Sequence, residues 1–118
     1  MEKIPLKVWN RIALLESPIA AEINTNDARY RRWIAILPNL PSAVIPDPLP
    51  YYQYCIMDSL YDAEQLQVHA LQMNEDLALI NEARYFVSNE NELYQQLAEL
   101  EVDPTLFNSP WRVDHPSV

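Results

Sequence analysis

Apolar residues recur at alternating spacings of three and four through the middle of the chain, which is the spacing that keeps one face of a helix apolar. This coiled-coil-like pattern predicts one long helix over residues 48–87. Asp58 and Ser59 interrupt the pattern, so a break near residue 58 stays an open alternative. The positions form two seven-residue series: Leu49, Ile56, Ala63, Ala70 and Leu77, and Tyr52, Ser59, Leu66, Met73, Ile80 and Val87.

Local start signals predict three shorter helices and one final turn around the long helix. A proline in the first turn and a Ser, Asn or Asp just before it are typical of helix starts. The predicted elements are residues 6–15 after Pro5, 17–23 from Ser17-Pro18, 89–102 from Asn89 with Glu92 as a capping box, and 103–107 from Asp103-Pro104.

Residues 24–37 have two interpretations. A helix would bury Tyr30, Trp33 and Leu37 on one face, and we favour it. The alternative is a strand over residues 33–37, rich in Trp, Ile and Leu, behind a hairpin turn at residues 24–27.

Together these elements predict an all-α fold class. The chain is expected to form a single compact domain, residues 1–118, of four to five helices around the long one, with a small β-ribbon around residues 23–37 as the alternative. Residues 38–50 contain five prolines and are predicted to be an extended, Pro-rich connector. Residues 111–118 are predicted to be an irregular, mobile tail.

The amino-acid composition excludes several classes of ligand-binding and catalytic site. The chain has no glycine, which the phosphate-binding loops, the dinucleotide fingerprint and the nucleophile elbow all require. Turns and helix ends must therefore use other residues at left-handed positions, and asparagine is the expected substitute. The candidates are Asn24, Asn26, Asn39, Asn89 and Asn108.

The net charge of −9 is unevenly distributed. Only Arg84 and Arg112 are basic after Trp33, so most of the chain should repel phosphate backbones, and no direct nucleic-acid binding is expected. No apolar run is long enough for a membrane span, and one cysteine permits no internal disulfide. We therefore expect a cytoplasmic protein that does not bind membranes.

No residue pattern predicts catalysis, a cofactor or a metal, so the chain is predicted not to be an enzyme and to take no small-molecule substrate. His69 has no His, Asp or Glu three or four residues away, and His115 is expected to be exposed in the tail. Cys55 is expected to be a buried small hydrophobe.

A tyrosine-rich patch next to the prolines is the predicted partner-binding surface, together with two alanines that permit close helix approach. Stacking of the prolines on these tyrosines is the alternative. The residues are Tyr51, Tyr52, Tyr54, Tyr61, Ala63 and Ala70. They predict a non-enzymatic protein–protein interaction module: an adaptor, an assembly factor or a small subunit, whose partner is another protein or a second copy in a homodimer.

The acidic residues give a second hypothesis. A small acidic inhibitor or immunity-type protein, which blocks a basic, nucleic-acid-handling partner by mimicking its substrate, would use such a surface. Its residues would be Glu75, Asp76, Glu82, Glu90, Glu92, Glu99, Glu101 and Asp103.

Overall fold

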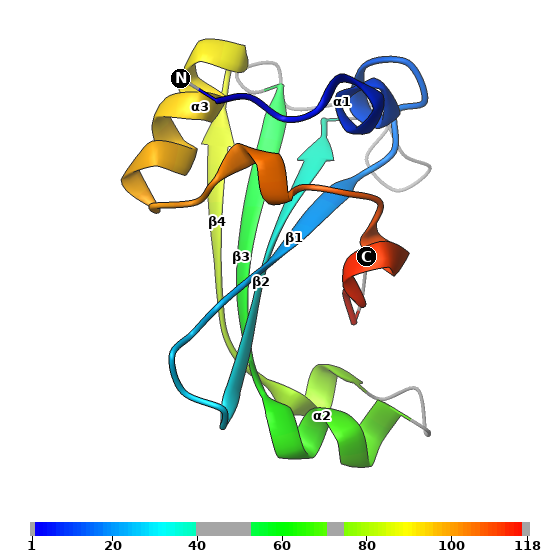
Figure 1. Cartoon of the computed structure of the whole chain (residues 1–118), viewed down its shortest axis with the longest axis vertical. Helices are drawn as coiled ribbons and strands as arrows, with labels where there is room; N and C mark the ends of the chain where they lie inside the picture. Colours follow the sequence, from blue (N-terminus) through cyan, green and yellow to red (C-terminus); the bar gives the residue numbers. More distant parts are fainter. Residues whose placement is uncertain (1, 40–52, 71–74, 117–118) are drawn as a thin grey trace.

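The computed structural model describes residues 2–39, 53–70 and 75–116, and its centre is a four-stranded antiparallel sheet. The strands follow one another in the order β1-β2-β3-β4 (Figure 1). The strands are β1 (Ile19–Ile23), β2 (Tyr30–Pro38), β3 (Tyr54–Asp62) and β4 (Leu79–Val87); the helices are α1 (Leu6–Ala13), α2 (Ala63–Ala70) and α3 (Glu90–Glu99). Short 3-10 helices cover Glu75–Ala78, Pro104–Leu106 and Pro110–Val113. The fold is therefore mixed α and β, and the all-α prediction is wrong.

The long helix predicted over residues 48–87 is wrong because most of its described part is strand. β3 and β4 occupy its two ends, and of the described residues between them the eight of α2 form an α-helix. β3 is buried on both faces, because other segments of the chain cover both sides of the sheet, so its apolar residues do not alternate. Such a continuous run is hard to distinguish from a buried helix by spacing alone.

The hairpin alternative for residues 24–37 is confirmed, and the helix favoured there is wrong. β1 and β2 pair in antiparallel fashion from Ile19 opposite Ile36 to Ile23 opposite Arg32. The short helix predicted over residues 17–23 is wrong for the same reason, because that segment is β1. Asn26 has the positive φ of 63° that the turn requires.

The terminal helices were predicted well. α1 begins after Pro5 and buries Ile12, and α3 buries Leu93 and Leu97. Asn89 caps α3: its side-chain oxygen accepts a hydrogen bond from the Glu92 N–H at 2.9 Å. The predicted turn after Asp103 is the 3-10 helix Pro104–Leu106.

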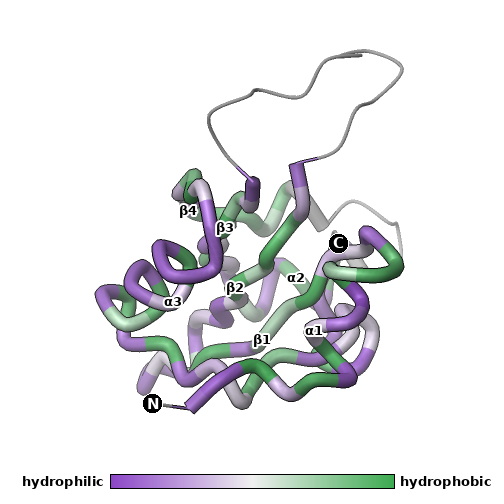
Figure 2. Tube along the Cα trace, turned by 90° about the horizontal axis from the view of Figure 1, so that it is seen from above, coloured by the Kyte–Doolittle hydropathy of each residue, from purple (hydrophilic) through white to green (hydrophobic). Residues whose placement is uncertain are grey.

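Both faces of the sheet are packed, but by different parts of the chain. On one face lie α1 and α3 (Figure 2), and the Pro104–Leu106 turn, orange in Figure 1, crosses the same face. The core there comprises Ile19, Ala21, Ile34, Ile36, Tyr54, Ile56, Val87, Leu93, Leu97 and Phe107, among others. On the other face Trp33 and Tyr61 pack against Leu66 and Ala78, while Val113 of the C-terminal segment covers Ala20, Ala35 and Met57.

Without glycine, the chain places ordinary residues at left-handed backbone positions. Positive φ angles occur at Glu16, Asn26, Glu101 and Asp114 among the described residues. Of the five asparagines expected at such positions, only Asn26 has one. In the described ranges, no helix has the length and apolarity needed to cross a lipid bilayer.

Candidate functional site

A hollow of about 460 Å³ lies where β2, α2 and the C-terminal segment meet. The 3-10 helix Pro110–Val113 stands beside the sheet above α2 (Figure 1). The described residues that line the hollow are Arg31, Ala63, Leu66, Gln67, Trp111, Asp114, His115 and Pro116. This hollow combines aromatic and aliphatic surface with a few polar groups, which is typical of binding sites.

The C-terminal segment is fixed to the sheet by hydrogen bonds. Asn108 exchanges two backbone hydrogen bonds with Ala20 of β1, at 2.9 and 3.0 Å. The Trp33 indole N–H donates to the Val113 carbonyl oxygen at 2.7 Å. Asp114 then takes a left-handed conformation, with φ 56° and ψ 36°, that turns the chain back over the hollow. One wall of the site is therefore held in place by β1 and β2.

His115 is buried beneath this turn, contrary to the expectation of an exposed tail residue. Its backbone N–H donates to the Pro110 carbonyl oxygen at 3.0 Å, and its ring centroid lies 5.9 Å from that of Trp33. Burial lowers the pKa of His115 to about 4 from the ordinary 6.5. The imidazole is therefore neutral at physiological pH and presents a polar, uncharged group to the site.

Arg31 forms the charged side of the hollow. Its guanidinium stacks on the Trp33 ring at 4.6 Å and makes two hydrogen bonds of 2.8 Å to the Glu22 carboxylate. These hydrogen bonds raise the pKa of Arg31, and the charge of Asp114 acts in the same direction. Because Glu22 holds it in a bidentate pair, the guanidinium has a fixed orientation.

Trp111 is the most exposed aromatic side chain of the site. Its relative exposure is 64%. The Arg11 guanidinium lies over one face of its ring, 4.7 Å from the ring centroid. Leu14 and Leu15, shortly after Arg11 in the chain, are exposed as well. A large aromatic surface that stays in water is characteristic of an interaction surface.

A second, more polar hollow of about 700 Å³ adjoins the first along the β1–β2 turn. The two share Arg31, Ala63 and Gln67 as lining residues. The turn itself is ordered by Thr25, whose hydroxyl donates to the Asp27 carbonyl oxygen at 2.7 Å. A ligand longer than one side chain therefore has a continuous surface to follow.

The side chains that line the hollow limit the chemistry it can perform. Of the described residues that line it, none is Ser, Thr, Cys or Lys, and the groups with nucleophilic character are the Asp114 carboxylate and the His115 imidazole. His115, with a pKa of about 4, is a weak base near neutral pH. Within the described ranges, no three His, Cys, Asp or Glu side chains come together in a way that would hold a metal ion.

The predicted tyrosine patch is not an exposed surface where the structure describes it. Tyr54 is buried against Trp9 on one face of the sheet, and Tyr61 is buried against Trp33 on the other. Tyr51 and Tyr52 lie outside the described residues. Ala63 does line the hollow, and Ala70 ends α2, although its side chain is outside the description.

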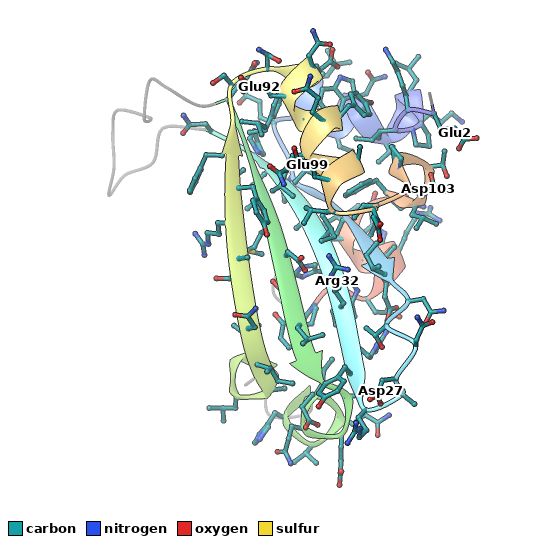
Figure 3. All side chains as sticks on the ribbon, turned by 90° about the vertical axis from the view of Figure 1, so that its left-hand side faces the viewer. Glu2, Asp27, Arg32, Glu92, Glu99 and Asp103 are labelled. Atoms are coloured by element: carbon teal, nitrogen blue, oxygen red, sulfur yellow. The ribbon has the colours of Figure 1, made fainter. Side chains whose placement is uncertain are left out.

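The structure gathers five of the eight predicted acidic residues. Figure 3 shows Glu92, Glu99 and Asp103 on the outer side of the helical layer, with Glu2 close by in the view. Glu90 and Glu101 are also exposed in this segment. Glu82 is separate, on β4, where Arg84 pairs with it at 3.3 Å. Glu75 and Asp76 belong to a 3-10 helix, and their side chains are outside the description.

The hollow could hardly be predicted from the sequence, because its residues come from three distant segments. Arg31, Gln67 and His115 are separated by more than 35 positions each and meet only through the sheet. One signal was present: a tryptophan and a histidine in a predicted solvated tail are more typical of packed structure than of a mobile one.

The fold and the hollow define a mixed α and β protein built on an antiparallel sheet, with a binding-type cavity beneath its C-terminal segment. No protein-family model, no curated protein and no solved structure matches the chain.

Proposed function

We propose that this protein is a non-enzymatic protein–protein interaction module that takes an aromatic or large aliphatic side chain of a partner into the hollow beside Trp111. The exposure of Trp111 on a backbone held by the sheet carries the proposal. Tryptophan is enriched among the residues that dominate binding energies, and a fixed backbone reduces the entropy lost on binding.

The size and polarity of the hollow support a side chain as its occupant. About 460 Å³ lies within the range of ligand sites, and an apolar side chain would lie against Trp111 and Leu66. The polar groups of Gln67, Asp114 and Arg31 would then hydrogen-bond the backbone of the partner. A cytoplasmic location belongs to the same proposal, because the one cysteine, Cys55, is a buried thiol.

Selection from a displayed library of random peptides tests this function. We expect the selected peptides to share an aromatic or large aliphatic residue and to bind Trp111→Ala at least about tenfold more weakly, since such anchors contribute about 2 kcal/mol or more. The matched control is Leu106→Ala, which removes an exposed apolar side chain outside the hollow. Peptides that bind both variants equally well would show that the hollow is not the binding site.

A second candidate function rests on the exposed acidic segment. Between Arg84 and Arg112 the chain has no Lys or Arg, and its five carboxylates belong to α3 and the segment after it. Figure 3 labels three of them, Glu92, Glu99 and Asp103. An acidic inhibitor of a basic, nucleic-acid-handling partner would present such a surface. Lys3, which lies 5.9 Å from the Tyr94 ring centroid, reduces the negative charge at one side of it.

A further inference from the structure

β4 is an edge strand of the four-stranded sheet. Eight of its nine residues pair with β3, and among the residues that the structure describes no strand pairs with its other side. In Figure 3 it is the strand nearest the viewer. An edge strand turns alternate N–H and C=O groups outward, which is a template for pairing with another strand.

The sequence of β4 is complementary to itself when reversed. Ala83 is its middle residue, with Glu82 on one side and Arg84 on the other. Ile80 and Phe86, both about half exposed, lie three residues away in either direction. Two copies that pair antiparallel about Ala83 therefore oppose unlike charges and like apolar side chains.

We propose that two copies of this chain pair β4 against β4 about Ala83 and so form one eight-stranded sheet. The partner is thus a second copy of the chain. The dimer surface is separate from the hollow, because β4 lies at the opposite edge of the sheet from β1 and the C-terminal segment (Figure 1).

Charge selects this register over its neighbours. A two-fold axis perpendicular to the sheet keeps each face on its own side, so opposed residues are separated by an even number of positions. An axis at Glu82 would oppose two glutamates, and an axis at Arg84 would oppose two arginines. Only the axis at Ala83 places Glu82 opposite Arg84 of the second copy, twice. Opposite charges in such cross-strand pairs are favourable, and like charges are not.

The geometry of β4 sets the extent of the pairing. The register with β3 shifts between Leu60, which lies opposite Asn81, and Tyr61, which lies opposite Leu79, so Ile80 is an extra residue that forms a bulge in β4 itself. A bulge ends regular pairing, so the ladder between copies runs from Asn81 to Tyr85. Ile80 and Phe86 then meet at each end of it. Five ladder residues and two apolar contacts predict a reversible dimer that depends on concentration.

Light scattering over a range of protein concentrations tests the dimer. We expect the mass to rise from the 13.8 kDa of one chain toward twice that value. Glu82→Arg and Arg84→Glu should each weaken self-association at least tenfold, because each opposes like charges at two positions. The double variant E82R/R84E should dimerise again. An equimolar mixture of the two single variants should form a mixed dimer, while each remains monomeric alone.

A cysteine at the axis checks the register. Ala83→Cys places two thiols opposite each other, so mild oxidation should link the copies rapidly. Asn81→Cys is the matched control, because it faces Tyr85 of the second copy and should link much more slowly. Circular dichroism establishes that each variant is folded.

Two results would overturn the proposal. One is a wild-type protein that keeps the mass of a single chain at every concentration. The other is a dimer that charge reversal at Glu82 or Arg84 leaves intact, since it would use another surface. The variant Trp111→Ala should dimerise as the wild type does, so failure of the peptide-binding function and failure of the dimer are distinguishable.

Discussion

At the scale of single residues, Trp33 connects the parts of the candidate site. Its side chain is fully buried and meets Tyr61 edge-on, with ring centroids 5.5 Å apart. Arg31 stacks on it, and its N–H holds Val113. The helix interpretation of the sequence buries Trp33 as well. Neither the helix nor the strand interpretation indicated its partners, because Val113 is 80 positions away.

The tyrosines show how side chains are misplaced when a strand is interpreted with the side-chain spacing of a helix. On a helix, only one or two of the four clustered tyrosines can lie on the apolar face, so a helix predicts that the others lie on the surface. In β3 both faces are covered, so Tyr54 and Tyr61 are buried on opposite sides of the sheet. The residue types were compatible with either structure, and only the pairing of β3 with two neighbours decided between them.

His115 predicts a pH dependence of stability. Its folded pKa of about 4 lies below the ordinary 6.5, so the unfolded chain binds a proton more readily. The free energy of unfolding should therefore fall as the pH decreases from about 6.5 to about 4, by on the order of 2 kcal/mol, and change little from this group below that. Above pH 6.5 the contribution is fully present.

Urea unfolding across this pH range measures the effect, with His115→Gln as the comparison. Asp27, whose pKa is lowered to about 2 chiefly by its hydrogen bond with Arg29, changes stability only at lower pH, below its ordinary value of 3.8. The wild type should lose more stability than the variant between about pH 6.5 and 4. Equal losses would mean that His115 is not held in its neutral form.

At the scale of elements, the helix starts and turns that depend on local interactions could be predicted from the sequence. The strands β3 and β4, which depend on pairing with other strands, could not. The start of α3 depends on Asn89 and Glu92, and the turn at Asp103 depends on Thr105, whose N–H donates to the Asp103 carboxylate at 2.9 Å. Both signals lie within four residues. β3 and β4 instead depend on strands far away in the sequence, so spacing alone favoured a helix for them.

The cap of α3 permits a direct test. Asn89 accepts from the Glu92 N–H, and the Glu92 carboxylate in turn accepts from the Ser88 N–H at 2.6 Å. Asn89→Ala should lower the free energy of unfolding by about 1 kcal/mol. Asn91→Ala, an exposed position within the helix, should not lower it, since alanine is the better helix former. Chemical denaturation of both variants measures this, and equal stability would argue against the capping role.

At the scale of the whole molecule, pairing neutralises much of the basic charge. Arg29, Arg31 and Arg32 form ion pairs of 2.8 Å with Asp27, Glu22 and Asp58 respectively. The sequence showed a more basic N-terminal third, but the fold surrounds these arginines with carboxylates from β1, the turn and β3. The negative charges of α3 and the following turn are in contrast exposed, so the helical layer dominates the field of the molecule.

Salt separates the two candidate functions on the intact protein. A peptide anchored in the hollow should bind nearly as well at about 1 M salt as at about 0.1 M, because apolar contacts are not screened. Binding through the acidic segment should instead weaken steeply over this range, as the screening length falls from about 10 Å to about 3 Å.

The variant E92Q/E99Q/D103N should leave the anchored peptide unaffected but remove most of the association with an arginine-rich peptide at low salt. The control E16Q/E64Q removes exposed charges elsewhere and should change neither. We expect the selected peptides to follow the first pattern. If they follow the second, with binding abolished in the triple variant, the acidic segment is the functional surface and the inhibitor function replaces the hollow.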